Sequence, residues 1–213
     1  LIFLFYDRVG RCNPCGCCSY SLRLQMFLND NEIRHLAMHD GMLSPFESSM
    51  VKVIDGVRVL GFGLDTAGYD LRLADGLRVF SDTLNAGEVI DPKNFDERHL
   101  ADLSANKDGK FLLPPHTTGL AMAVERFRMP RNVGALVIAK STYARCGVSL
   151  NATKIVPGWE GELVLEITNQ TPKPVVLYVD EGIASVLFYR TNDPGATYSG
   201  GYQGQSGVTL PKA

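Results

Sequence analysis

Short runs of alternating apolar and polar residues occupy most of the chain after residue 50. In the run at 51–60 roughly every second residue is apolar, as in a strand that buries one face, and the run at 163–167 is apolar apart from Glu166. Further strands are expected at 68–73, 77–80, 111–113, 120–124, 133–138, 148–150, 175–179 and 186–189. Many short strands separated by Gly and Pro turns predict a mainly β fold of the sandwich or barrel kind.

Two Asp-Gly dipeptides interrupt this pattern. Asp55 and Gly56 lie in the middle of an alternating run, and Asp75 and Gly76 lie between two shorter runs. Because this dipeptide favours two-residue hairpin turns, we expect a turn at each position. Residues 91–110 are rich in Asp, Lys and Asn and predict a long surface excursion.

One short helix is expected near the start of the chain, over residues 29–38. An Asn-Asp-Asn triplet can cap its N-terminus, and Ile33, Leu36 and Ala37 share one face. Gly41 is suited to end it. No repeat, linker or charge block divides the chain after this helix, which predicts a single domain.

The first 25 residues lack this patterning. We expect residues 1–25 to be a non-native or disordered N-terminal extension and the domain to span residues 26–213, beginning at Met26. Four of the five cysteines lie in this stretch, at Cys12, Cys15, Cys17 and Cys18. A disulfide framework would spread its cysteines along the chain, so a reducing, cytoplasmic setting is expected.

The cysteine cluster also raises the question of zinc. Pro14 to Cys18 matches the P-C-x-x-C half of the zinc nucleobase-deaminase signature, but no histidine begins an H-x-E motif. Four crowded cysteines fit poorly with two separated ligand pairs. A zinc site is therefore the weaker interpretation.

Composition excludes two classes of partner. The chain has 213 residues, with 45% hydrophobic and 21% charged residues, as in an ordinary globular protein. Its net charge of −2 offers no bulk attraction to a nucleic-acid backbone. No apolar run reaches the roughly 18 residues of a membrane span. We therefore expect neither nucleic acid nor a membrane as a partner.

A polar segment, residues 140–147, follows the apolar strand at 133–138. Its hydroxyls, Ser141 and Thr142, and its cations, Lys140 and Arg145, suit phosphate oxygens. From composition alone, however, an exposed polar strand end is the more common explanation.

Glu166 lies within the apolar run at 163–167. Alternation places it on the face of Val164, opposite Leu163 and Ile167. If the leucine face is the core, Glu166 faces either a cavity or solvent. A carboxylate in an apolar cavity suits general-base catalysis, whereas an outward strand glutamate would be solvated.

Several blocks of sequence, in the same order, resemble the dCTP deaminase family. They are residues 67–73, 89–96, 114–115, 140–147, 157–161, 163–169 and 202–211. The block at 67–71 is also similar to the related dUTPases. The resemblance implies a distorted β jelly roll, assembled as a homotrimer with active sites at subunit interfaces. It also implies hydrolysis of dCTP to dUTP and ammonia, with Mg²⁺ accompanying the triphosphate and no zinc.

The resemblance assigns roles to five residues. Glu166 matches the catalytic base that deprotonates a water attacking C4 of cytosine. Ser141 and Arg145 match residues that hold this water and the developing charge, and Lys140 and Thr142 match phosphate ligands. The other substrate contacts that it implies are Tyr143, Ala144, Val164, Leu165, Ser185, Tyr198 and Gln205.

The sequence also departs from the family pattern. Ser185 stands where Gln is usual, Gly201 stands where Lys is usual, and the stretch from Tyr198 to Gln205 is about three residues short. We therefore expect weaker triphosphate binding and a raised KM. Relatives that also cleave dUTP carry an acidic residue at the position of Val156, so a monofunctional deaminase is expected.

Two alternatives remain open at this stage. One is a dUTPase or a bifunctional deaminase–dUTPase. The other is a non-catalytic protein that uses the same fold to bind nucleotide and regulate a partner. The Gly-rich segment after Tyr198 either orders over a ligand or is a frayed C-terminus.

Overall fold

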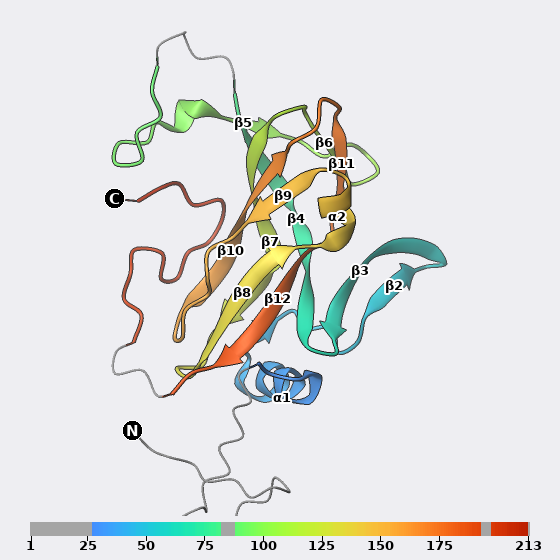
Figure 1. Ribbon diagram of the computed structural model, residues 1–213, viewed down its shortest axis with the longest axis vertical. Helices are drawn as coiled ribbons and strands as arrows, with labels where there is room; N and C mark the ends of the chain where they lie inside the picture. The colour runs from blue at the N-terminus through green and yellow to red at the C-terminus, as the bar shows by residue number, and fades with distance from the viewer. Residues whose placement is uncertain (1–26, 82–87, 193–196, 213) are drawn as a thin grey trace, which may run out of the picture.

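The computed structural model describes residues 27–81, 88–192 and 197–212 (Figure 1). The expectation that residues 1–25 are non-native, and the four clustered cysteines, lie outside the described residues. The elements, in order, are α1 (Asp30–Asp40), β1 (Leu43–Ser44), β2 (Val51–Ile54), β3 (Val57–Asp65), β4 (Gly68–Phe80), η1 (Glu97–His99), β5 (Leu100–Leu103), β6 (Lys110–Leu113), β7 (Thr118–Arg128), β8 (Val133–Ala139), α2 (Ser141–Arg145), β9 (Val148–Asn151), β10 (Glu160–Asn169), β11 (Val175–Tyr178) and β12 (Gly182–Arg190).

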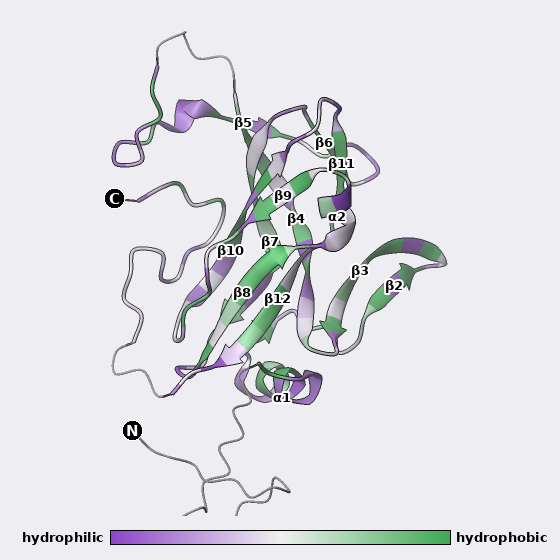
Figure 2. Cartoon of the chain, in the orientation of Figure 1, coloured by the Kyte–Doolittle hydropathy of each residue, from purple (hydrophilic) through white to green (hydrophobic). Residues whose placement is uncertain are grey.

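The strands form a distorted β jelly roll, so the predicted mainly β fold is confirmed. A ten-stranded sheet follows the order β2-β3-β4-β7-β10-β9, with β1 on β7, β5 on β4, and β12 between β4 and β8; β6 and β11 pair separately. The strands carry most of the hydrophobic residues (Figure 2). Side chains from β8 and β12 join those from β7 and β10 in one buried apolar cluster.

The N-terminal helix α1 forms where the sequence predicts it. Asn29 is the N-cap: its side chain accepts a hydrogen bond from the Glu32 amide at 3.0 Å, and the Glu32 carboxylate accepts one in return from the Asn29 amide. Ile33, Leu36 and Ala37 are buried, and Gly41 ends the helix in the left-handed conformation. In the part of the chain that the structure describes, no helix is long and apolar enough to cross a membrane.

The two Asp-Gly dipeptides have different structures. Asp55 and Gly56 both have positive φ, 48° and 80°, and form the predicted hairpin turn between β2 and β3. The turn predicted at Asp75 and Gly76 is wrong, because β4 continues through them. Gly76 has a φ of 144°, and the register with β7 shifts there, as in a β-bulge.

This bulge lets β4 pair with different strands before and after it. Before it, β4 pairs with β3 and β12; after it, β4 pairs with β5 and also with β7, which it already contacts at Leu73. The long excursion predicted at 91–110 is also partly wrong. Residues 97–103 form η1 and β5, and His99 and Leu100 are buried.

Candidate active site

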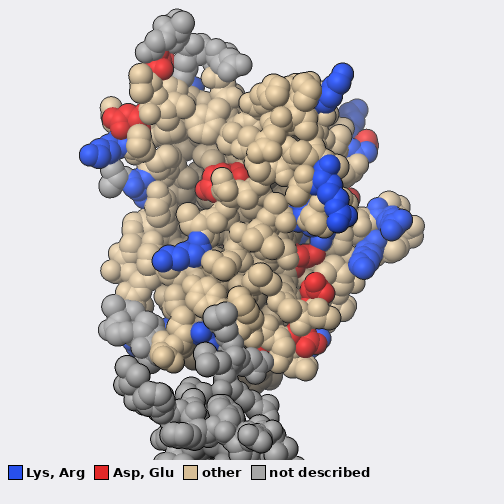
Figure 3. All heavy atoms as spheres, viewed as in Figure 1, with Lys and Arg blue, Asp and Glu red and all other residues tan. Residues whose placement is uncertain are grey.

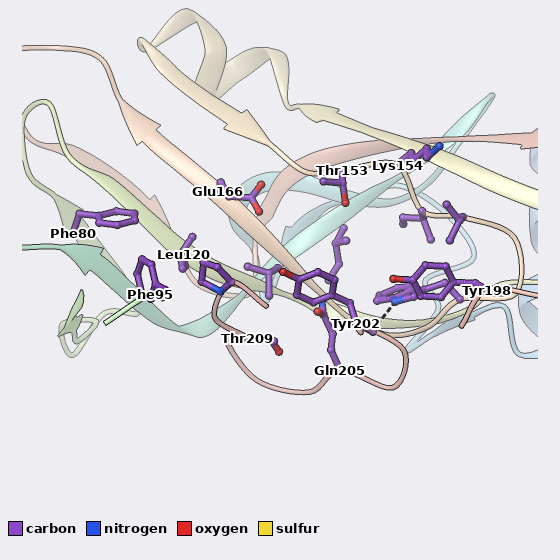
Figure 4. Close-up of a pocket in the computed structure, with 16 residues that line it drawn as sticks. Phe80, Phe95, Leu120, Thr153, Lys154, Glu166, Tyr198, Tyr202, Gln205 and Thr209 are labelled. Carbon is purple, nitrogen blue, oxygen red and sulfur yellow. Dashed lines mark hydrogen bonds between the residues drawn. The ribbon is translucent and has the colours of Figure 1, made fainter. Parts of the chain in front are cut away.

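A cavity of about 510 Å³ opens beside β10, and sixteen residues line it (Figure 4). Its walls come from β7 and β10, the segment between β9 and β10, the end of β4, the loop before η1, and the C-terminal tail (residues 197–212). Of these lining residues, Glu166 is the one acid and Lys154 the one cation. Most of the others are apolar or aromatic, which makes the cavity a low-dielectric setting for that carboxyl.

Strict alternation along β10 places Glu166 in the cavity. Leu163, Leu165 and Ile167 are buried in the core, although Leu163 also reaches the cavity lining. Val164 and Glu166 point the other way and are half-buried. The sequence left cavity and solvent as alternatives for Glu166. The structure places this side chain in the cavity wall.

Burial raises the pKa of Glu166 above its ordinary value, because the carboxyl is desolvated among apolar side chains. A hydrogen bond from its own backbone opposes this effect in part. A carboxyl with a raised pKa accepts a proton more readily and can later release it to a leaving group. This is the one titratable group in the cavity wall that combines burial with such a shift.

The C-terminal tail is docked against the start of β10. The Trp159 indole donates to the backbone oxygen of Tyr202 at 2.9 Å, and the side-chain Nε2 of Gln205 donates to the backbone oxygen of Glu162 at 2.6 Å. The Glu162 carboxylate accepts a hydrogen bond from the Gly207 amide at 2.9 Å. The tail therefore forms one wall of the cavity.

The polar segment 140–147 is a one-turn helix rather than a polar strand end. Lys140 precedes α2, and its ammonium forms an ion pair with Asp70, in which both side chains are largely buried. Tyr143 is buried, and its hydroxyl accepts a hydrogen bond from the Tyr178 amide at 3.1 Å. Burial raises the pKa of this hydroxyl. Because of its ion pair with Asp70, the Lys140 ammonium is held by a carboxylate in this structure.

The structure brings together only some of the predicted site residues. Glu166, Val164, Tyr198 and Gln205 all line the cavity. The residues that do not line it are Lys140, Ser141, Thr142, Tyr143, Ala144, Arg145, Leu165 and Ser185. Ser185 lies on β12, paired with Asp70 and Ile138. Within one chain, Glu166 is therefore in a different place from the α2 residues.

Sequence reasoning missed several residues of the cavity wall. Phe80 and Phe95 are partly buried aromatic residues from the end of β4 and the loop before η1. Lys154 lies in an irregular segment after β9. Their positions depend on contacts between distant segments, and none carries a local signal.

The fold and the site define a β jelly roll with a desolvated carboxyl in a tail-covered cavity. A model of the dCTP deaminase-like family matches residues 27–191. The chain belongs to this family.

The relatives support the assignment over nearly their whole length. The dCTP deaminase of Acidithiobacillus ferrooxidans strain ATCC 53993 is 42% identical over 189 residues, which is 87% of this chain and 98% of the relative. That of Nitrosospira multiformis is 43% identical, over 86% of this chain and 97% of the relative.

A solved structure supports the fold. The crystal structure of 2′-deoxycytidine 5′-triphosphate deaminase from Agrobacterium tumefaciens superposes with a TM-score of 0.55 at 19% identity. The match covers 78% of this chain and about half, 48%, of that one.

Replacing Glu166 by Gln should stabilise the fold in a pH-dependent way. Below the ordinary glutamate pKa of about 4.3 the carboxyl is protonated whether the chain is folded or not, so the substitution should change little. As the pH rises through the raised pKa of the folded state, ionisation in the cavity costs stability that Glu166→Gln does not lose.

Thermal unfolding between pH 4 and pH 8 measures this effect. The Tm of Glu166→Gln minus that of the wild type should increase with pH. Glu97→Gln, at an exposed position, controls for the general effect of removing one negative charge. A difference that is flat or decreases with pH would contradict the assignment of a desolvated carboxyl.

Proposed function

We propose that this protein hydrolyses dCTP to dUTP and ammonia. The observation that carries the proposal is Glu166, a desolvated carboxyl in a cavity large enough for a nucleotide base. The dCTP deaminases that match over 97–98% of their own length support the choice of substrate.

In the proposed mechanism Glu166 acts first as a base and then as an acid. Its carboxylate takes a proton from a water whose oxygen bonds to C4 of cytosine. The protonated carboxyl then delivers that proton to the amino group, the C4–N bond breaks and ammonia leaves. The second hydrogen of the water passes from the C4 hydroxyl to N3, which gives uracil. A raised pKa suits both steps, because the proton must be held and then released near neutral pH.

We further propose that Ser141 and Arg145 act on substrate bound to a neighbouring copy of the chain. Their absence from the cavity that holds Glu166 supports this division, as does the family's implied homotrimer. In the proposed roles, Ser141 holds the attacking water and Arg145 stabilises the charge that develops on the ring.

An exposed apolar face is available for such an assembly. On β8, Leu136 and Ile138 are 44% and 49% exposed, and they pair with Leu187 and Ser185 of β12. The surface over β8 and β12 shows few charged side chains (Figure 3). Exposed apolar residues on adjacent strands are typical of an interface between subunits.

The triphosphate is assigned to residues around the tail and α2. Tyr198 and Gln205 line the cavity, while Lys140 and Thr142 would come from the neighbouring copy. Magnesium would enter with the nucleotide: the one carboxylate in the cavity wall is too small a ligand set for a protein-held ion. We place the reaction in the cytoplasm, where the deoxynucleotide pool is.

Cleavage of dUTP is the less favoured function. Val156 lines the cavity as an apolar residue, at a position where we expect an acidic residue in bifunctional relatives. A neutral side chain there cannot act as a second base for a water that attacks phosphate.

Incubation with Mg²⁺ and dCTP should produce dUTP and ammonia in equal amounts. Glu166→Gln should lower kcat by a factor of about 10² to 10⁴, because the proton acceptor is lost. Binding of dCTP should be largely retained. Coupled ammonia detection, nucleotide chromatography and calorimetric titration measure these quantities. Release of dUMP and pyrophosphate would instead indicate dUTP cleavage, and normal turnover by Glu166→Gln would contradict the mechanism.

Mixed oligomers test whether each site is shared between chains. Ser141→Ala and Glu166→Gln should each be inactive, yet their co-expression should restore activity. In a cyclic trimer assembled at random from equal amounts, about a quarter of the shared sites combine an intact Glu166 with an intact Ser141. Sedimentation analysis gives the number of subunits. No recovery in mixed trimers would place both residues in one chain's site.

Gly201→Lys should lower the KM for dCTP. The structure leaves room for this side chain: a Cβ on Gly201 would lie 3.8 Å from Lys212 Cδ, an ordinary van der Waals contact. A cation there would add about 1 kcal/mol of phosphate binding, or about five-fold in KM, with kcat little changed. Steady-state kinetics measures the effect, and Gly201→Gln serves as the uncharged control. An unchanged KM would mean that the tail at this position does not face the phosphates.

A further inference from the structure

A row of side chains crosses the sheet through Glu166. Leu120 of β7 pairs with Glu166 on one side and with Arg78 of β4 on the other. Asn151 of β9 pairs with the far side of Glu166, and Asp102 of β5 with the far side of Arg78. Directly paired residues of antiparallel strands point to the same face, so Leu120 lies between the carboxyl and the guanidinium.

Leu120 is well placed to separate the two charged groups. Its side chain is buried, with 9% of the residue exposed, and neighbouring strands lie about 4.8 Å apart. Arg78 therefore lies two strands, or about 10 Å, from Glu166. The Arg78 guanidinium forms an ion pair with Asp102 at 3.2 Å, on the side away from Leu120.

Two aromatic rings close the same end of the cavity. Phe80, two residues beyond Arg78 on β4, contacts Phe95 edge-on, with ring centroids 6.3 Å apart. Phe95 in turn lies 5.8 Å from the ring of the buried His99. Phe80, Phe95 and Leu120 lie together at the end of the cavity beyond Glu166 (Figure 4).

We propose that Leu120, Phe80 and Phe95 form an apolar wall that keeps water and the Arg78 guanidinium away from Glu166, and that this wall sets the pH range in which Glu166 works. They are positioning residues, since they act through Glu166. The inference rests on the proposed function, in which Glu166 takes and releases the proton.

On the strands on either side of Glu166, no charged side chain is paired with it. β7 offers no titratable side chain beside Leu120, where Thr118 instead bonds to Thr168 at 2.9 Å. β9 offers the neutral Asn151. The remaining groups that face the cavity or lie near it are Lys154, Tyr198 and Tyr202 in its lining, Glu162 on the same face of β10, His99 behind Phe95, and the Asp96–Arg98 pair before and within η1.

The direction of the effect follows from desolvation. An apolar wall disfavours the ionised carboxyl, and a nearby guanidinium would favour it. Opening the wall admits water and exposes Glu166 to the positive charge of Arg78, and both changes lower the pKa. Since the reaction requires the ionised base in the free enzyme, the acid limb of kcat/KM should move to lower pH.

Three variants of the full chain test the wall. Leu120→Asn replaces the insulating side chain, and Phe95→Ala opens the wall from a half-buried loop position that the core depends on less. Met122→Ala is the matched control, because Met122 is on the same strand and face as Leu120 but is not part of the cavity lining. If Leu120→Asn does not fold, Phe95→Ala carries the test.

The measurements are the pH dependence of kcat/KM for dCTP and a ¹³C NMR titration of the Glu166 carboxyl, assigned by its loss in Glu166→Gln. We expect both the acid limb and the titration midpoint to move down by about half a pH unit or more in the wall variants, and to stay in place in Met122→Ala. Folded wall variants with unchanged midpoints would overturn the inference.

The titration separates this inference from the proposed function. If the wild type does not deaminate dCTP, the carboxyl midpoint still reports whether the wall controls Glu166. If dCTP is deaminated and Glu166→Gln is inactive, but the midpoint does not respond to the wall, the function holds and only the wall's role is lost.

Discussion

The alternation of side chains along β10 is the constraint on which the site depends. The Leu163, Leu165 and Ile167 face is buried in the core, so the strand cannot slip by one residue without exposing three large apolar side chains. With the register held in this way, Glu166 must lie on the cavity side, opposite Leu120. Core packing thereby positions a chemical group that contributes nothing to the core.

The same strand also holds the cover of the cavity. Near the start of β10, the Glu162 backbone oxygen and carboxylate accept hydrogen bonds from the tail. Trp159, just before the strand, donates to the Tyr202 carbonyl. The Glu166 carboxyl and the tail are thus both positioned by β10, which fixes where one lies relative to the other. A desolvated acid and the segment that helps to exclude water from it are parts of one arrangement.

The α2 segment is anchored to the other half of the fold. The ion pair of Lys140 with Asp70 joins the end of β8 to β4, and the buried Tyr143 hydroxyl bonds to β11. These contacts fix Ser141 and Arg145 on a rigid base away from Glu166's cavity. A rigid base would suit the role proposed for Ser141 and Arg145 on a neighbouring copy, because their placement would then depend on subunit packing and not on loop motion.

Local chemistry alone determined much of this protein: the capping box and Gly41 of α1, the hairpin turn at Asp55 and Gly56, and the alternation of β10 all follow from residues within a few positions of each other. The turn expected at Asp75 and Gly76 shows the limit, because the same dipeptide accommodates a bulge when two neighbouring strands pair across it. Only the tertiary structure decided that Glu166 faces a cavity. The walls of that cavity, among them Phe80, Phe95 and Tyr202, come from segments far apart in the chain, and desolvation depends on all of them together.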